Sequence, residues 1–158
     1  MVQLQAAGGS NLTDFGRLTV TRHMFEKGVS FLTAAALLDK NNGHPSVVLH
    51  LLCQGAEIVL KAILLRVDYK SYRPMLRTLG HNLSELGSEV RKATKLHVFI
   101  GAAGQELSQL ERFYKHHLLR YAHSFDIIID ARTIPCARVT RHLKAVVELC
   151  QRRGTFER

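Results

Sequence analysis

The chain has 158 residues and a formal net charge of +9, from 22 Lys and Arg against 13 Asp and Glu. One domain accommodates this length, and a hydrophobic fraction of 46% is that of a globular protein, which excludes wholesale disorder. The sequence has no run of about 18 apolar residues, so we expect no transmembrane helix. It opens without a basic and then apolar segment, so we expect no secretory signal. The positive charge is spread over every quarter of the chain, so it permits a nucleic-acid partner without requiring one.

Helical periodicity recurs along the chain, whereas the alternation typical of strands is almost absent. The first predicted helix opens near Asn11–Asp14, where capping side chains cluster, and ends at about Lys40. The segment Asn41–Pro45 ends it, because Asn and Gly suit a left-handed C-cap and proline suits the first turn of a new helix. The second predicted helix, about Pro45–Arg66, is apolar nearly all round, which is typical of a central helix covered by others.

A loop is predicted at Val67–Pro74, followed by a third helix from the capping-box residues Asn82 and Glu85 to about His97. After a break at Val98–Gly104, a fourth helix is predicted at about Gln105–Tyr121. The segment His123–Ile134 is predicted to be irregular, although Ile127–Ile129 could be extended, and a fifth helix follows at about Pro135–Arg152. The sequence therefore predicts an all-α, single-domain bundle of about five helices over residues 11–152. Residues 1–10 are predicted to be a flexible N-terminus and residues 153–158 a C-terminal tail.

Four basic residues are concentrated around the predicted loop that follows the second helix: Arg66, Lys70, Arg73 and Arg77. They could face the phosphates of a nucleic acid, or they could form a solvated connector in a basic protein. The Gly101–Gly104 segment has the outline of a GXXG loop, but the strands of a KH domain are missing around it. We interpret it as a turn between helices.

The cysteines and histidines do not form a recognisable metal site. Cys53, Cys136 and Cys150 are odd in number and widely spaced, which argues against a disulfide framework and a zinc site and favours a reducing, cytoplasmic setting. His116 and His117 are adjacent, so on a helix their side chains point about 100° apart. No HExxH motif occurs among the nine histidines, and we expect no metal and no cofactor.

A thin polar stripe is predicted along the second helix. It consists of His50, Gln54, Glu57 and Lys61, at spacings of four, three and four. Glu57 stands four residues before Lys61, the favourable order for an ion pair on one helix. On the surface such a pair stabilises little. If it is buried, its polar atoms need further partners, and His81 and Asn82 are candidates.

Three short motifs occur in order: AEIVLKA within Leu51–Ala62, GHNL at Gly80–Leu83, and LLRY at Leu118–Tyr121. Together they resemble the HEPN superfamily of helical bundles, over roughly residues 15–150. The resemblance implies a four- or five-helix bundle that usually forms a homodimer. Many members are metal-independent ribonucleases, often toxins paired with a nucleotidyltransferase-like antitoxin. In those members an Arg and a His with four to six residues between them form the active site across the dimer.

Arg112 and His117 have the implied spacing on the fourth predicted helix. Arg17–His23 and Arg91–His97 fit the spacing too, but the family motif lies after the Gly-His-Asn-Leu element, which favours Arg112 and His117. In that chemistry the histidine handles the proton of the 2′-hydroxyl or of the leaving group, and the arginine neutralises the phosphate. The first hypothesis from these residues is therefore a metal-independent endoribonuclease.

The second hypothesis, which we prefer, is a HEPN-like protein that binds RNA, a nucleotide or a partner protein in a toxin–antitoxin or defence setting, without established catalysis. Its expected ligand-binding or structural polar cluster comprises Glu57, Lys61, His81, Asn82, Arg120 and Tyr121. A third hypothesis is a regulator that binds acidic protein surfaces. Under all three the protein is expected to be cytoplasmic and away from the membrane.

Overall fold

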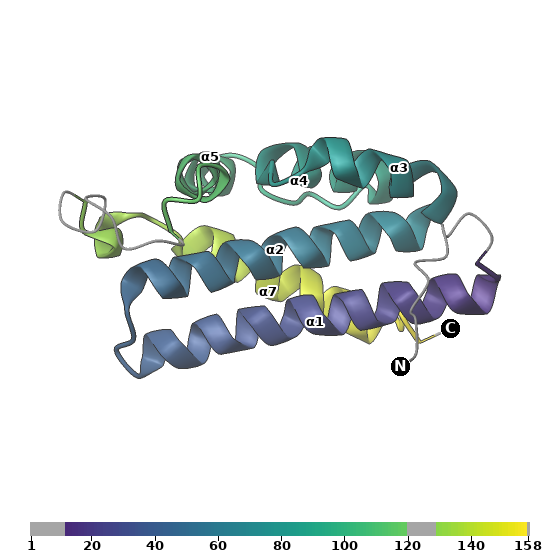
Figure 1. The fold of residues 1–158 in the computed structure, drawn as a ribbon, viewed down its shortest axis with the longest axis horizontal. Coiled ribbons are helices and arrows are strands. Elements are labelled where there is room, and N and C mark those ends of the chain that lie inside the picture. Colours follow the sequence, from purple (N-terminus) through teal and green to yellow (C-terminus); the bar gives the residue numbers. More distant parts are fainter. Residues whose placement is uncertain (1–11, 120–128, 158) are drawn as a thin grey trace, which may run out of the picture.

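The computed structural model describes residues 12–119 and 129–157, and every regular element in these two stretches is helical. The predicted all-α bundle is thus confirmed. In chain order the elements are α1 (Asp14–Lys40), α2 (Pro45–Val67), α3 (Tyr69–Leu79), α4 (Leu83–Thr94), α5 (Ala102–Lys115), the 3-10 helix η1 (Ala131–Thr133) and α7 (Ala137–Arg152) (Figure 1).

Helix α2 is the centre of the bundle. It packs against each of the other elements, and Figure 1 shows it between α1 on one side and the layer of α3, α4 and α5 on the other. Its residues Leu60 and Leu64 are fully buried, together with Leu83 and Leu86 of α4 and Leu110 of α5. An apolar helix surrounded in this way supplies most of the hydrophobic core, as its composition predicted.

Helix α2 is also the one stretch of the described chain that could cross a membrane by length and composition. In the bundle, 61% of that apolar stretch is buried by the other helices. A core helix passes the same test of length and hydropathy as a membrane span, because both are enriched in large aliphatic side chains. Its burial accounts for the apolar character of α2 without a membrane.

Helices α1 and α2 form a long hairpin whose backbones approach closely at two glycines. A Cβ atom on Gly28 would lie 2.7 Å from Val59 Cγ2 and 2.9 Å from the Val59 backbone nitrogen. A Cβ atom on Gly55 would lie 3.0 Å from the Gly28 carbonyl oxygen. Real side chains do not fit at these distances, so the two glycines allow the axes to come together and to bury the shared face.

The predicted loop at Val67–Pro74 is wrong, because this segment begins helix α3. Asp68 caps the helix: its Oδ1 accepts from the Ser71 backbone N–H at 3.1 Å, and its Oδ2 accepts from the Ser71 hydroxyl at 2.7 Å. Pro74 lies inside the helix and is exposed. A proline at this position favours a break, but the Asp68 cap and the packing of the helix on the core outweigh it. The half-buried Tyr72 and Leu76 pack against the core and hold the helix in place.

The predicted break between the third and fourth helices is present, but with different bounds. Helix α4 ends at Thr94 and not at about His97, because Lys95 adopts a left-handed conformation with φ 61°. Helix α5 begins at Ala102 and ends at Lys115, both earlier than predicted. A Cβ atom on Gly104 would lie 2.7 Å from the Phe99 carbonyl oxygen, so this glycine lets the connection fold tightly onto α5.

The last predicted helix is confirmed as α7, and the segment after it packs back onto the bundle. Phe156 is buried and stacks on Phe25 of α1 with ring centroids 4.2 Å apart. The Arg66 Nε donates to the Thr155 carbonyl oxygen at 2.7 Å. The predicted tail at 153–158 is therefore anchored through Phe156. The predicted flexible residues 1–10 and the predicted extended residues 127 and 128 lie outside the described residues.

Candidate functional site

The most unusual polar residue of the core is Glu57, which is 5% exposed in the apolar middle of α2. A buried carboxylate is costly unless its oxygens are paired and hydrogen-bonded. The Lys61 Nζ lies 2.6 Å from Glu57 Oε1, and the lysine side chain is half-buried, with 14% of it exposed. The predicted i, i+4 pair therefore forms, with its carboxylate in the interior.

The second oxygen of Glu57 is bound by two residues from other elements. Its Oε2 lies 2.8 Å from His81 Nδ1, in the turn between α3 and α4, and accepts from the Tyr114 hydroxyl of α5 at 2.6 Å. The hydroxyl is also 2.9 Å from Gln54 Oε1. We call Glu57, Lys61, His81 and Tyr114 the Glu57 cluster, which joins three separate parts of the chain.

Glu57 is ionised in this cluster. Burial by itself raises the pKa of its carboxyl, but hydrogen bonds from Lys61, Tyr114 and His81 together outweigh burial and hold the pKa below its usual value. Because an ionised carboxylate can only accept, the nearby ring nitrogen Nδ1 of His81 must carry a proton. The other ring nitrogen of His81, Nε2, lies on the far side of the ring from Glu57.

The Glu57 cluster reaches the surface through its histidine. The His81 side chain is 43% exposed, and its ring meets the exposed His117 ring edge to face, with centroids 5.7 Å apart. His117 follows α5 in a left-handed conformation with φ 57°, and its backbone N–H donates to the Tyr114 carbonyl oxygen at 3.1 Å. The turn that caps α5 thus brings His117 next to His81.

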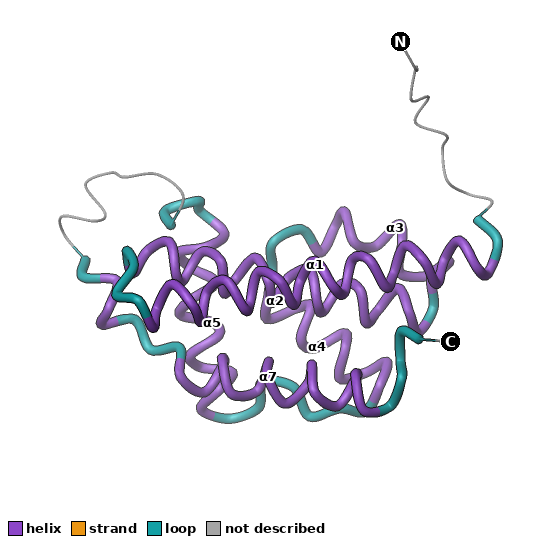
Figure 2. The backbone as a smooth tube through the Cα atoms, turned by 90° about the horizontal axis from the view of Figure 1, so that it is seen from below, coloured by secondary structure: helices purple, strands orange, loops and turns teal. Residues whose placement is uncertain are grey.

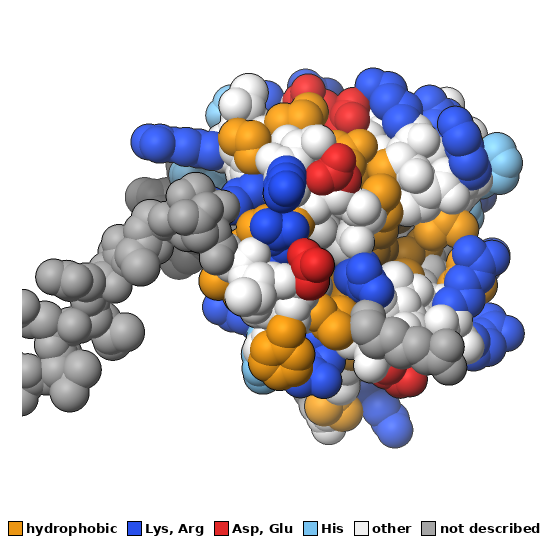
Figure 3. Space-filling model, turned by 90° about the vertical axis from the view of Figure 1, so that its right-hand side faces the viewer, with side chains coloured by type: hydrophobic (Ala, Val, Ile, Leu, Met, Phe, Trp, Pro, Cys, Tyr) orange, Lys and Arg blue, Asp and Glu red, His pale blue; other side chains and the backbone are white. Residues whose placement is uncertain are grey.

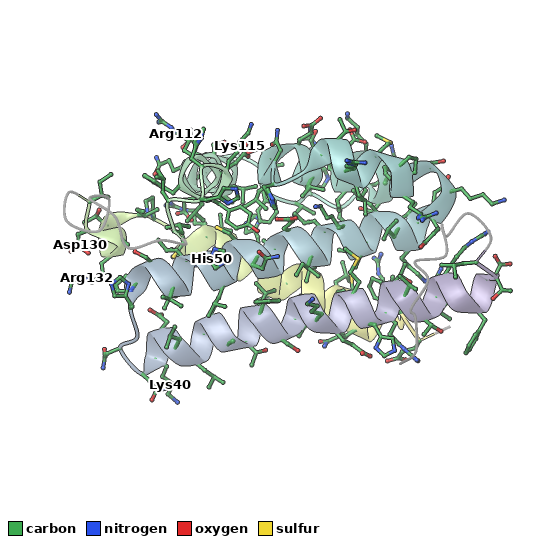
Figure 4. All side chains as sticks on the ribbon, in the orientation of Figure 1. Lys40, His50, Arg112, Lys115, Asp130 and Arg132 are labelled. Atoms are coloured by element: carbon green, nitrogen blue, oxygen red, sulfur yellow. The ribbon has the colours of Figure 1, made fainter. Side chains whose placement is uncertain are left out.

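The structure places the other predicted site residues apart from this cluster. Asn82 is the N-cap of α4: its Oδ1 accepts from the Glu85 backbone N–H at 3.0 Å, and its Nδ2 donates to Glu85 Oε2 at 3.0 Å. It therefore caps a helix and does not contact Glu57. Arg112 is exposed and lies with Lys115 on the side of α5 turned away from α2 (Figure 4). Arg120 and Tyr121 lie outside the described residues.

A second buried carboxylate, which the sequence did not reveal, lies on α5. Glu106 is 5% exposed, and its Oε2 accepts from the backbone N–H groups of Arg138 and Val139, at 2.8 Å and 3.2 Å. These amides belong to the first turn of α7, whose N-cap residue Cys136 provides no side-chain cap. Burial raises the pKa of Glu106, but these hydrogen bonds and that of the Arg138 guanidinium outweigh it, so the pKa is lowered. We call this arrangement the Glu106 cap.

Helix α5 caps a second helix in the same way. Glu111 Oε2 accepts from the Ser84 backbone N–H in the first turn of α4 at 2.8 Å. One helix therefore supplies carboxylates to the N-termini of two others, where the helix dipole favours negative charge. No sequence signal marks these contacts, because they join residues 27 and 32 positions apart.

The predicted basic cluster divides into two parts. Lys70, Arg73 and Arg77 are exposed, and their spacing places them on one face of α3. Arg66 instead binds the C-terminal segment through Thr155. Figure 3, which faces this end of the molecule, shows Lys and Arg side chains interspersed with acidic and apolar ones. This interspersion favours a solvated surface over a compact phosphate-binding patch.

Two grooves lie away from the Glu57 cluster. A largely apolar groove of about 380 Å³ is bordered by α1, α2 and α7 and is lined by Leu32, Ala36, Leu52 and Val147 among others. Figure 2 shows α7 running roughly parallel to α1 and separated from it in this view. A more polar groove of about 630 Å³ lies at the turn between α1 and α2, beside Asp130 and Arg132 (Figure 4). The Arg132 Nε binds the Asp130 carboxylate at 3.0 Å.

The described part of the chain holds no group of three His, Cys, Asp or Glu side chains that could bind a metal ion. Of the three thiols, Cys53 is almost fully buried, and burial raises the pKa of its thiol far above the usual range. Such a thiol is a packing group and not a nucleophile.

Fold and site together define a class: an all-α bundle whose central helix carries a buried Glu–Lys pair, held by a histidine and a tyrosine from neighbouring elements. Comparison with protein-family models, with curated proteins and with solved structures finds no match. A functional conclusion therefore depends on the chemistry of the site and on the motifs in the sequence.

Proposed function

We propose that this chain is a HEPN-like protein that binds RNA or a nucleotide at the surface formed by His81 and His117 above the Glu57 cluster. One observation carries the proposal: the 2.8 Å contact between Glu57 and His81. It joins the AEIVLKA motif of α2 to the GHNL motif before α4, the first two of the three motifs that resemble the superfamily. Motifs that meet in space have a shared role, either in stability or in a site.

The charges of this surface suit a phosphate group. Lys61 neutralises Glu57, so the cluster carries no net negative charge that would repel an anion. His81 and His117 present two imidazole rings at this surface. Both rings are exposed and can donate hydrogen bonds to phosphate oxygens. A formal net charge of +9 favours the encounter with RNA and makes it sensitive to salt.

Fluorescence anisotropy with a labelled single-stranded RNA tests this proposal. The double variant His81→Ala/His117→Ala should weaken binding about tenfold or more, since a hydrogen bond to a charged group contributes roughly 1.5–3 kcal/mol. The matched control is His97→Ala, which removes another exposed histidine and should leave the affinity unchanged. Equal affinities of the double variant and the wild type would contradict binding at this surface.

A second candidate function is a metal-independent endoribonuclease, and the proximity of His117 to His81 favours it. Two adjacent histidines can serve as the acid and the base of phosphodiester cleavage without a metal. The candidate predicts RNA cleavage in the presence of EDTA that is abolished by His117→Ala with the fold intact. Arg112, the other residue of the predicted pair, would have to act on RNA from the outer side of α5. Cleavage that persists in His117→Ala would exclude His117 as a catalyst.

The proposal includes a homodimer. The apolar groove between α1, α2 and α7 is lined on α1 by Leu32 and Ala36 among others. A second copy would bury this face, as an isologous helix pair does in many dimers. Light scattering after size exclusion should give twice the chain mass, and Ala36→Arg, which places a charge in the groove, should give a monomer. A monomeric wild type would contradict the dimer.

The biological setting also belongs to the proposal and is supported by the sequence resemblance. It comprises a toxin–antitoxin or defence role, a nucleotidyltransferase-like antitoxin as partner, and a cytoplasmic location away from the membrane. Expression in a host cell tests the setting: a toxin should slow growth, and co-expression of a nucleotidyltransferase-like antitoxin should relieve that effect. Unimpaired growth with the protein present at high level would contradict a toxin role.

A further inference from the structure

We infer that His81 is the general base of the candidate ribonuclease, that the neighbouring His117 is its general acid, and that Glu57 is a positioning residue for His81. This inference rests on the second candidate function above. It differs from the predicted Arg112–His117 pair, because both reacting groups come from one protomer and the structure already holds them side by side.

The first step is the orientation of His81. Glu57 Oε2 binds Nδ1 at 2.8 Å, and the carboxylate is itself fixed by Lys61 at 2.6 Å and by the Tyr114 hydroxyl at 2.6 Å. The neutral ring then has its single proton on Nδ1 and its lone pair on Nε2. A carboxylate that orients an imidazole in this way also stabilises the positive charge that the ring acquires when it accepts a proton.

The second step is the placement of the two rings. His81 and His117 meet with centroids 5.7 Å apart and planes at 76°, and both residues are exposed. In an in-line displacement the attacking and leaving oxygens stand on opposite sides of phosphorus, so the base and the acid must be two separate groups beside one phosphate. Two exposed imidazoles this close together can both reach the oxygens of one phosphodiester bound over them.

The reaction balances without a further reagent. His81 Nε2 takes the proton of the ribose 2′-hydroxyl, and the 2′ oxygen forms a bond to phosphorus. The bond from phosphorus to the 5′ oxygen breaks, and protonated His117 gives its proton to that oxygen. The products are a 2′,3′-cyclic phosphate and a free 5′-hydroxyl, with one proton moved from substrate to His81 and one from His117 to product.

The titratable groups around the pair come from every element packed against it. His81 faces Glu57, Tyr114 and His117, and Lys61 is bound to the far oxygen of the same carboxylate. The His50 ring lies 5.9 Å from the Tyr114 ring, on the inner side of the cluster. Glu57 and Lys61 compensate each other in charge.

The first experiment measures cleavage of a labelled RNA oligonucleotide by the full chain in EDTA. His81→Asn keeps a side-chain N–H for Glu57 but offers no base, and it should lower kcat/KM by about 10²–10⁴, the usual contribution of a general base. His117→Ala should lower it to a similar extent, and His97→Ala should not change it. Thermal melting of each variant confirms that the fold is intact. No cleavage by the wild type overturns the ribonuclease candidate together with this inference.

The second experiment separates the base from the acid. An RNA whose scissile 5′ oxygen is replaced by sulfur has a leaving group that departs without a proton, because thiols are far more acidic than alcohols. This substrate should restore cleavage in His117→Ala and should not restore it in His81→Asn. Rescue of His81→Asn, or failure to rescue a folded His117→Ala, overturns the assigned roles while leaving the ribonuclease candidate in place.

The third experiment tests Glu57 as a positioning residue. Glu57→Gln retains an oxygen that can accept from His81 Nδ1 but loses the charge that stabilises the protonated ring. It should lower kcat at least about tenfold with KM unchanged, because its effect falls on the base and not on RNA binding. If this variant does not fold, Tyr114→Phe removes one hydrogen bond to the same oxygen and should lower kcat in the same way, by less. An unchanged kcat in both variants overturns the role of Glu57.

Discussion

Glu57 and Glu106, the two buried carboxylates among the described residues, are equally hidden from solvent but have partners of different kinds. Glu57 is held by the side chains of Lys61, His81 and Tyr114, all of which can gain or lose a proton. Glu106 is held by two backbone amides of α7 and one exposed arginine. Backbone amides do not titrate, so the Glu106 cap can only stabilise. The Glu57 cluster reaches the surface through His81.

Among changes to the partners of these two carboxylates, we expect Lys61→Met to cause the largest loss of stability. This change leaves the Glu57 carboxylate buried without its ammonium partner, and breaking a buried pair on one side costs about 3–5 kcal/mol. We expect the lower end of this range, because His81 and Tyr114 still hydrogen-bond the carboxylate in this variant. Urea unfolding measures the loss. An unchanged midpoint would contradict a buried, ionised Glu57 cluster.

The double variant Glu57→Gln/Lys61→Met sharpens this test. It replaces the charged pair by neutral groups of similar size, so the remaining cost is mainly that of the altered hydrogen bonds. It should recover much of the stability that Lys61→Met loses. A double variant less stable than the single one would show that the charge of Glu57 is not the source of the loss.

A smaller loss is expected for Glu106→Ala, at the other carboxylate. The change leaves the backbone N–H groups of Arg138 and Val139 without an acceptor at the start of α7, and an unsatisfied buried donor costs about 1–3 kcal/mol. Glu148→Ala is the matched control, because Glu148 is 48% exposed and approaches Arg152 only at 4.0 Å. The melting temperature should fall in the first variant and stay nearly constant in the second.

The pH dependence of stability separates charge from packing at Glu106. Its pKa is lowered in the folded state, so its contribution is fully present above the ordinary glutamate pKa of about 4.3 and is lost as the pH falls through the lower folded value. Glu106→Gln removes this contribution at every pH. The difference in unfolding free energy between wild type and Glu106→Gln should therefore be largest at pH 6–7 and shrink below about pH 4. A difference that is constant over this range would contradict an ionic cap.

The smallest effect is expected for Arg138→Ala. Its guanidinium lies 3.0 Å from Glu106 Oε1, but the side chain is 59% exposed, and solvent screens exposed pairs so that they contribute about 0–1 kcal/mol. The backbone amides continue to satisfy Glu106 in this variant. Comparison with Lys61→Met by urea unfolding sharpens the contrast between the two carboxylates. Similar losses in both variants would show that Arg138 matters as much to its carboxylate as Lys61 does.

Features that depend on near neighbours in the chain could be predicted. The apolar surface of α2, the capping box of Asn82 and Glu85, and the approach of Lys61 to Glu57 each involve residues within about one helical turn, where helix geometry fixes the spacing. The position of His81 against Glu57 was one of two predicted possibilities, and Asn82, the other, serves α4 instead.

Features that depend on distant partners could not be predicted from the sequence. Pro74 predicted a break, but the cap at Asp68 and the packing of Tyr72 and Leu76 made this segment a helix. Tyr114 and Glu106 carry no local signal, because their partners lie tens of residues away.

The sequence by itself determined that this chain forms an all-α bundle around α2, and that α2 carries a polar stripe with a Glu–Lys pair. Only the tertiary structure decided that the carboxylate of the pair is buried, that Tyr114 and His81 complete the cluster, and that His117 stands beside His81 at the surface. The physical reason is that hydrophobic periodicity is a local property of a helix. Burial and hydrogen-bond partners are set by which helices pack together.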